Sequence, residues 1–274
     1  MTILLSAGRA AANFLGRDSW LVRRLRPSYE SLLGWSTAGH GIPWEINRVA
    51  CRIDSRHRYQ MGSPYDASVA SWLAQRVKPG QVAVDVGANV GVYVLQFAHW
   101  AGPTGKVIAI EPNPAARAVL EKHVRLNDLR ARVEIVPAAV GAASGEATLF
   151  VADTDGMSRL GAPNPLIADR TIPIPVPVVT LDDLCETRGL VPDWLLLDIE
   201  GFEIAALSGA RRLLSGRAKR PGVVVEMHPD SWAVAGTSRA SAEALFRELR
   251  LCPEPLSGQT DPLGTHAHVW LRPA

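Results

Sequence analysis

The sequence predicts an α/β fold with a mostly parallel central sheet and helices on both faces. Strand-like and helix-like stretches alternate from about residue 81 onward, and such alternation is typical of parallel sheets. The apolar run over residues 194–197 has the pattern of a strand buried on both faces. A glycine-containing turn also separates the first strand-like stretch from the helix-like stretch that follows it. We therefore expect one Rossmann-like domain.

The expected elements follow in order along the chain. Helices are expected over residues 67–77, 89–100, 114–127, 180–188, 202–214 and 241–250. Strands are expected over residues 81–86, 105–110, 132–140, 146–152, 194–199, 223–227 and 266–271. The Lys78-Pro79-Gly80 sequence should end the first helix, Pro114 should begin another, and Thr180 should cap a third.

Residues 153–177 interrupt this alternation. They are rich in Gly, Pro, Asn and Asp, and Pro173, Pro175 and Pro177 alternate with apolar residues. Because alternating prolines cannot donate the hydrogen bonds of a central strand, we expect an exposed loop and an edge strand here. This segment is our candidate for a lid over the ligand site.

The first part of the chain is less regular. We divide the protein into an N-terminal extension, residues 1–62, and a ligand-binding domain, residues 63–274. The extension has no clean hydrophobic period, so we expect one or two helices and short strands that could cap the site. Residues 9–26 form a basic amphipathic stretch, which could touch an anionic membrane weakly. A solvated helix face packed on its own protein is the favoured interpretation.

Composition excludes several classes of protein. With 47% hydrophobic residues, 20% charged residues and a net charge of +2, the chain is typical of a globular protein and gives no reason to expect nucleic acid as a partner. Its three cysteines include no C-x-x-C pair, so neither a zinc site nor a disulfide framework is indicated, and we assign no metal site. No apolar run reaches the ~20 residues of a membrane-spanning helix, and no signal peptide is recognised. A cytoplasmic location is therefore expected.

The glycine turn indicates the kind of ligand. Gly87 can adopt a positive φ and admit a ligand close to the backbone, while Gly91 allows the next helix to pack against the sheet. The spacing is G-x-x-x-G, unlike the G-x-G-x-x-G of dinucleotide sites. Asp85, just before the turn, suits a cationic ligand and would repel a pyrophosphate. Glu111 ends the second strand, where an acid can accept hydrogen bonds from ribose hydroxyls. A nucleoside without phosphates is favoured over a purely structural turn.

Two further strands end in polar residues. Asp198 and Glu200 follow one apolar strand, and Glu226 and His228 lie at the end of the next. Because parallel strands share one carboxyl edge, these side chains should emerge near the glycine turn. Asp198 and Glu200 could serve as a general base, a metal ligand or a positioning group. His228 could be a general base or a satisfied edge histidine, and Glu226 could be a hydrogen-bonded structural acid.

Other histidines and aromatic residues receive structural interpretations. His266 and His268 alternate with Ala267 on the last strand, which predicts a solvent-facing position. The eight tryptophans are scattered and are expected to serve packing.

Taken together and in order, these segments resemble the FkbM family of methyltransferases. The resemblance runs from roughly residue 65 to residue 229 and includes the paired Asp-x-Gly-Ala-Asn-x-Gly and Asp-Ile-Glu-Gly motifs. The matching segments are residues 84–91, 107–112, 127, 138–141, 180–183, 197–203 and 226–228.

The resemblance implies a class I methyltransferase fold with S-adenosylmethionine as methyl donor. Family acceptors are usually hydroxyl groups on sugars or natural products, so the expected partner is a small-molecule or glycan acceptor. The oligomeric state stays open. By position, the cofactor residues would be Asp85, Gly87, Ala88, Asn89, Gly91, Glu111, Pro112, Asn113, Ala138 and Ala139. The catalytic residues would be Asp198, Glu200 and His228.

The chain departs from the family pattern at one position. Relatives often carry Lys two residues before the signature Asp198, where this chain has Leu196. A non-catalytic module that binds S-adenosylmethionine is therefore one alternative. A second alternative is an NAD-dependent oxidoreductase, although the missing middle glycine and the presence of Asp85 argue against it.

Overall fold

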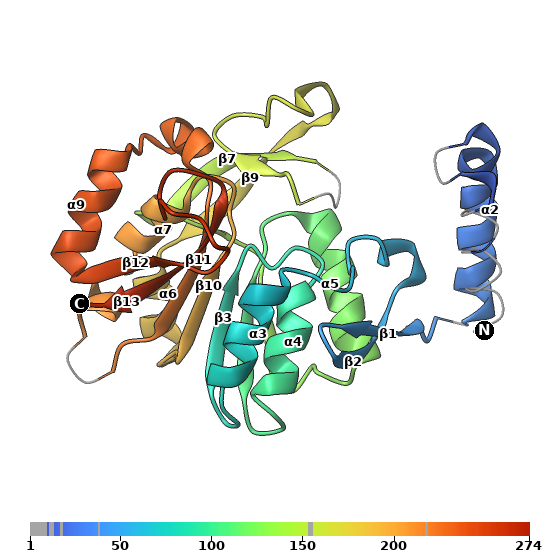
Figure 1. Ribbon diagram of the computed structural model, residues 1–274, viewed down its shortest axis with the longest axis horizontal. Helices are drawn as coiled ribbons and strands as arrows, with labels where there is room; N and C mark the ends of the chain where they lie inside the picture. The colour runs from blue at the N-terminus through green and yellow to red at the C-terminus, as the bar shows by residue number, and fades with distance from the viewer. Residues whose placement is uncertain (1–9, 11–13, 17–18, 38, 153–155, 217–218) are drawn as a thin grey trace.

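The computed structural model describes residue 10 and residues 14–16, 19–37, 39–152, 156–216 and 219–274. These residues form a seven-stranded sheet in the order β12-β13-β11-β10-β3-β4-β5 (Figure 1). Strand β13 runs antiparallel to both of its neighbours, and all other pairs among the described strands of this sheet are parallel. The expected mostly parallel sheet is confirmed. Its strands are β3 Val82–Val86, β4 Lys106–Ile110, β5 Val133–Val136, β10 Trp194–Leu197, β11 Gly222–Met227, β12 Leu251–Pro255 and β13 Ala267–Pro273.

Helices cover both faces of this sheet (Figure 1). Alternate strand residues face opposite layers. Leu195 and Leu197 of β10 pack in one apolar core, while Leu196 packs in the other. The Leu196 face is covered by α3 Ala67–Arg76, α4 Val92–Trp100 and α5 Pro114–Leu126. The opposite face is covered by α6 Leu181–Arg188, α7 Glu203–Ser208, α8 Arg211–Ser215 and α9 Arg239–Leu249.

The described N-terminal residues form α2 Trp20–Ser36 and the antiparallel hairpin β1 Ile42–Ile46 and β2 Val49–Ile53. The expected helix and short strands are thus present. Ile42, Ile46 and Ile53 are fully buried in the core beside α4 and α5. The hairpin is therefore part of the folded body. Part of the predicted basic stretch over residues 9–26 lies outside the described residues, and no described helix is long and apolar enough to cross a membrane.

The expected strand over residues 132–140 is divided between two sheets. It leaves the main sheet after Val136, because Pro137 has no N–H with which to continue the ladder. Residues Ala139–Val140 form β6 in a second sheet, whose described strands have the order β6-β9-β7-β8. The other members are β7 Gly145–Val151, β8 Arg159–Leu160 and β9 Ile172–Val179.

Strand β9 corrects the expectation of an edge strand for the proline-rich segment. It lies between β7 and β6, and it pairs with β7 from Ile172 to Val178. However, β6 reaches only Val178 and Val179. Backbone N–H groups alternate between the two sides of a strand, so the prolines at 173, 175 and 177 can all face the side without a partner there. Residues 153–155 of the predicted lid lie outside the described residues.

Three smaller expectations also change. The helix predicted over residues 202–214 is divided into α7 and α8, because the backbone leaves helical angles at Gly209 and Ala210. At Gly209 a side chain would also collide with the Gly141 carbonyl oxygen. Helix α4 begins at Val92, three residues later than predicted, because Asn89 and Gly91 adopt positive φ angles of 44° and 94°. Strand β12 was not predicted, since its prolines obscure the pattern; it lies at the sheet edge, where proline is tolerated.

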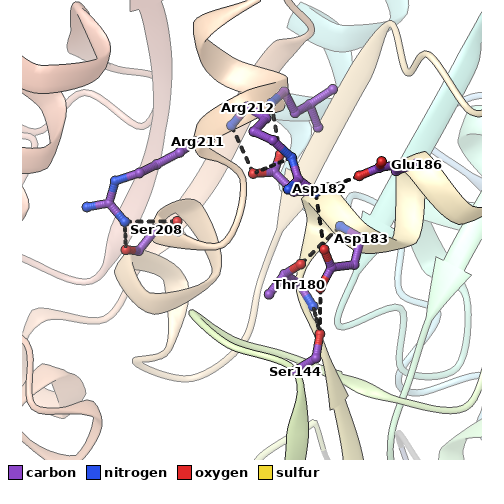
Figure 2. A network of polar contacts seen from close by, with 9 residues as sticks. Ser144, Thr180, Asp182, Asp183, Glu186, Ser208, Arg211 and Arg212 are labelled. Carbon is purple, nitrogen blue, oxygen red and sulfur yellow. Dashed lines mark hydrogen bonds and ion pairs between the residues drawn. The ribbon is translucent and has the colours of Figure 1, made fainter.

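The predicted cap at Thr180 is confirmed, and its neighbours join α6 to α8 (Figure 2). The Thr180 hydroxyl accepts the N–H of Asp183 at 3.0 Å. The Asp182 carboxylate accepts the backbone N–H groups of Arg212 and Leu213, both at 2.8 Å. Residues 180–183, which carry part of the family resemblance, therefore fix helix packing.

A buried histidine joins the hairpin to the glycine turn. Nδ1 of His123 lies 2.7 Å from the Val90 carbonyl oxygen, and Nε2 lies 3.0 Å from the Asp54 backbone nitrogen. These contacts require Nδ1–H to donate and Nε2 to accept, so the ring is neutral. Burial lowers the pKa of His123 to about 4.

This depressed pKa predicts a loss of stability in acid. In the unfolded chain His123 binds a proton near pH 6.5, whereas in the folded chain it does so only near pH 4. The contribution of His123 to the unfolding free energy is therefore fully present above pH 6.5 and is lost as the pH falls toward 4. We expect His123 to account for about 2 kcal/mol of lost unfolding free energy between about pH 7 and pH 5. Urea denaturation of the wild type and His123→Gln at both pH values measures it. Equal pH dependence in the two proteins would contradict this assignment.

Candidate functional site

The carboxyl ends of β3, β4, β10 and β11 open into a cavity of about 530 Å³. This volume falls within the rough range of 300–1,000 Å³ found for small-molecule sites. Gly91 is the one predicted site residue that does not line the cavity; it caps α4 instead. The predicted residues that do line it are Asp85, Gly87, Ala88, Asn89, Glu111, Pro112, Asn113, Ala138, Ala139, Asp198, Glu200 and His228.

The two sequence motifs meet at Gly87. This glycine has a φ of 85°, and a Cβ added there would lie 1.9 Å from the Asp198 carbonyl oxygen. The Asp198 N–H also donates to the Val86 carbonyl at 2.9 Å. Only glycine permits the glycine turn and the end of β10 to approach so closely.

Glu111 holds the turn from the other side. One carboxylate oxygen accepts the Asn89 N–H and the other accepts the Asn113 N–H, both at 2.7 Å. Burial raises the pKa of Glu111 to about 7, although these two N–H groups oppose the shift. Each oxygen keeps a second lone pair, so the carboxylate can still accept hydrogen bonds from a ligand.

Asp85 is a buried acid with an unsatisfied carboxylate oxygen among the described residues. Its side chain is almost fully enclosed, and within the described part of the chain its Oδ2 has no hydrogen-bond partner. Burial, together with the charges of Asp198 and Glu111, raises the pKa of Asp85 well above its usual range. A ligand ammonium group would supply the missing donor and a compensating charge.

Glu203, which was not predicted as a site residue, positions His228. Its carboxylate is fully buried and lies 2.5 Å from Nδ1 of His228. It also accepts the Gly201 N–H at 2.7 Å and the indole N–H of Trp232 at 3.1 Å. Burial alone would lower the pKa of His228, but the hydrogen bond to Glu203 and the nearby acids raise it to about 9. The other ring nitrogen, Nε2, is left to face the cavity.

Asp198 and Glu200 lie opposite this nitrogen. Each places a carboxylate oxygen 3.9 Å from His228 Nε2. Burial and the charge of Glu226 raise the pKa of Asp198 well above its usual range. The Asp198 side chain is 36% exposed, compared with 7% for His228, so Asp198 is the more accessible to a ligand. Glu200 has a φ of 49°, a conformation that is rare for residues other than glycine and is often found at functional sites.

The prediction that His266 and His268 face solvent is wrong for His268 but correct for His266. His268 is buried, and His266, though exposed, lines the cavity. Nε2 of His266 lies 2.8 Å from a Glu226 oxygen, and its ring packs 4.2 Å from the ring of His228. The cause is the antiparallel pairing that places His268 opposite Glu226. Local alternation carries no information on that long-range register.

The hairpin positions a lining residue that the sequence did not indicate, Tyr65. The side-chain amide of Asn47, in the β1–β2 turn, donates to the Tyr65 carbonyl at 2.6 Å and accepts the Tyr65 N–H at 3.0 Å. Tyr65 then packs edge to face against Tyr93, and both rings line the cavity. No motif marks these residues, because their position depends on contacts with distant segments.

The cavity is acidic. Its described lining includes no Lys or Arg, whereas five carboxylates line it: Asp85, Glu111, Asp198, Glu200 and Glu226. Such a wall attracts a cation and repels a phosphate. It therefore disfavours the pyrophosphate of a dinucleotide and favours a positively charged nucleoside.

Comparison with known proteins identifies a matching family. The sequence profile described as the methyltransferase FkbM domain matches residues 85–252. Comparison with curated proteins gave no match.

Solved structures with similar folds include three methyltransferases or related proteins. The methyltransferase FkbM from Methylobacillus flagellatus KT is 15% identical with a TM-score of 0.47, and the alignment covers 79% of this chain and 59% of that one. An S-adenosylmethionine-dependent O-methyltransferase from Thermotoga maritima is 15% identical with a TM-score of 0.45, covering 79% and 69%. Fibrillarin from Aeropyrum pernix, with natively bound S-adenosylmethionine, is 13% identical with a TM-score of 0.42, covering 74% and 73%. The chain thus spans less than two thirds of the first of these proteins.

The contact at Gly87 predicts an unusually costly substitution. Gly87→Ala should lower the unfolding free energy by roughly 3 kcal/mol or more, because both the positive φ and the Asp198 backbone oppose a methyl group. Gly189 is the matched control, with a φ of 59° and nothing within 4 Å of its added Cβ. Gly189→Ala should cost only about 1–2 kcal/mol. Urea denaturation measures the unfolding free energy of both variants and of the wild type. Equal losses of unfolding free energy in Gly87→Ala and Gly189→Ala would contradict the proposed steric constraint.

Proposed function

The chain belongs to the FkbM methyltransferase family, whose methyl donor is S-adenosylmethionine, and we propose that it methylates a hydroxyl group on a sugar, glycan or natural-product acceptor. This proposal rests on one observation: two groups of polar residues with different chemistry line the same cavity. The half around Asp85 and Glu111 suits a cationic nucleoside. The half around Asp198 and His228 holds groups that can orient an acceptor and accept its proton.

The residues of the first half fit the cofactor. Asp85 Oδ2, which lacks a partner among the described residues, would accept hydrogen bonds from the amino group of S-adenosylmethionine. Glu111 would accept hydrogen bonds from the ribose hydroxyls through its remaining lone pairs. Pro112, Asn113, Ala138 and Ala139 would line the part of the cavity that holds the adenine. The five lining carboxylates would stabilise the positive charge of the sulfonium.

S-adenosylmethionine supplies an electrophilic methyl group whose sulfur leaves as a neutral thioether. The protein must therefore align the acceptor oxygen with the methyl carbon, and alignment alone can contribute roughly 7–11 kcal/mol. A new O–CH₃ bond forms, the S–CH₃ bond breaks, and the hydroxyl proton must be accepted. We assign this proton to Asp198, because its carboxylate is exposed to the cavity and lies beside the glycine turn. His228, held by Glu203, would orient Asp198 and Glu200.

Two alternatives receive less support. The acidic lining disfavours an NAD-dependent oxidoreductase, since a pyrophosphate would face five carboxylates and, among the described lining residues, no Lys or Arg. The non-catalytic alternative rests on Leu196, a residue of the cavity lining at the position where relatives often carry Lys. In this protein, Asp198 and the Glu203–His228 pair provide polar groups beside that position. We therefore favour the enzyme.

The first test is binding of S-adenosylhomocysteine, measured by isothermal titration. The ribose hydroxyls should bind the ionised form of Glu111, whose pKa is about 7 without ligand. Affinity should therefore fall roughly tenfold from about pH 8 to about pH 6. In Glu111→Gln, binding should be weaker and its pH dependence smaller. Absence of binding to the wild type would refute the proposed function, whereas an unchanged pH dependence in the variant would refute only the role of Glu111.

The second test concerns Asp198. We expect Asp198→Asn to lower kcat by roughly 10²–10⁴-fold, because it removes the proton acceptor. Binding of S-adenosylhomocysteine should change little. Asp230→Asn, an exposed acid outside the cavity, is the control and should keep wild-type turnover. The assay follows methyl transfer to a hydroxyl acceptor found by screening. Wild-type kcat in Asp198→Asn would eliminate this residue as the base.

A further inference from the structure

The cavity lining includes a cluster that methyl transfer alone does not require. Glu226, His228 and His266 place one potential ligand atom each within 4.8 Å of one another. We propose that these three residues bind a divalent first-row metal ion, such as Zn²⁺ or Mn²⁺, beside Asp198. Its role toward the acceptor rests on the proposed function, whereas the binding site does not.

Two neighbouring strands build this cluster. Glu226 and His228 point to the same side at the end of β11, and His266 directly precedes the antiparallel β13. The His266 and Glu226 side chains are already in contact, at 2.8 Å. The two imidazole rings lie 4.2 Å apart at an angle of 38°. Small side-chain movements would therefore direct all three groups at one ion.

The orientation of His228 is that of a metal ligand. Its Nδ1–H donates to the fully buried Glu203 carboxylate, which fixes Nε2 as the nitrogen that faces the cluster. Histidines that bind metals almost always donate their other ring N–H to a carboxylate, carbonyl or water in this way. Glu203 is itself held by Gly201 and Trp232. This buried support is an observation independent of the three ligands.

The spacing to the neighbouring acids also fits an ion. Asp198 and Glu200 each hold an oxygen 3.9 Å from His228 Nε2, too far for a direct hydrogen bond. Two atoms that each lie about 2.0–2.2 Å from a zinc ion can be up to about 4.4 Å apart. A cation among them could therefore contact Nε2 and one of these carboxylates together.

The chemistry of the side chains limits the choice of ion. Two imidazoles and a carboxylate suit Zn²⁺, Mn²⁺ or Fe²⁺, whereas Ca²⁺ and Mg²⁺ prefer oxygen ligands alone. No Lys or Arg lines the described cavity to neutralise its five carboxylates. An ion at this place would offset part of that charge.

The ion would act on the acceptor. A hydroxyl oxygen bound to a divalent cation has a lowered pKa and a fixed position. Asp198, next to the cluster, could then accept the hydroxyl proton more easily. The acceptors favoured by this arrangement are hydroxyl compounds whose oxygen can reach both the cation and Asp198.

The test uses the full protein after removal of metal by a chelator. Titration with Zn²⁺ should show one binding site, and Mn²⁺ should give the electron paramagnetic resonance spectrum of a bound ion with nitrogen ligands. His266→Ala and Glu226→Gln should each weaken binding roughly tenfold or more. His99→Ala, an exposed histidine on α4 outside the cavity, should bind as the wild type does. Melting curves establish that each variant is folded.

The outcomes separate this proposal from the function. Absence of saturable binding to the wild type, or equal affinity in His266→Ala and His99→Ala, would overturn the metal site. S-adenosylhomocysteine binding, measured on the same proteins, reports on the proposed function independently. If the ion binds through these residues but S-adenosylhomocysteine does not bind, the metal site stands and the methyltransferase assignment fails.

Discussion

The site depends on the backbone contact between Gly87 and Asp198. With no room for a Cβ between them, the turn after β3 and the end of β10 form a single wall. That contact brings the proposed cofactor residues Asp85 and Glu111 into the same cavity as Asp198 and Glu200. Because each motif is positioned by the other, the cofactor and acceptor halves cannot be altered separately at this point.

Electrostatics gives the cavity its character. Burial raises the pKa values of Asp85, Glu111 and Asp198, so their ionised forms are costly without a compensating cation. Such a cluster favours binding of a positively charged ligand, because the ligand charge stabilises the ionised carboxylates. The sulfonium and ammonium groups of S-adenosylmethionine would supply positive charge. A metal ion at Glu226, His228 and His266 would supply more beside Asp198.

Much of this arrangement could be predicted from the sequence. The alternation of strands and helices predicted the mostly parallel sheet. The acids at strand ends predicted Asp85, Glu111 and Asp198 as site residues, because parallel strands end at the same edge of the sheet. Other features depend on contacts between distant segments. The antiparallel register of β13 places His266 at the cavity, and the Asn47 hairpin turn positions Tyr65. The second sheet, which the chain enters after Pro137, is likewise revealed by no local period.

The most direct test of this account is a crystal structure of the protein with S-adenosylhomocysteine. We predict that the ligand lies in the cavity between the glycine turn and β10, with its amino group hydrogen-bonded to Asp85 and its ribose hydroxyls to Glu111. Its sulfur should face the side of Asp198. A ligand bound elsewhere, or one that leaves the Asp85 carboxylate without a partner, would contradict the account.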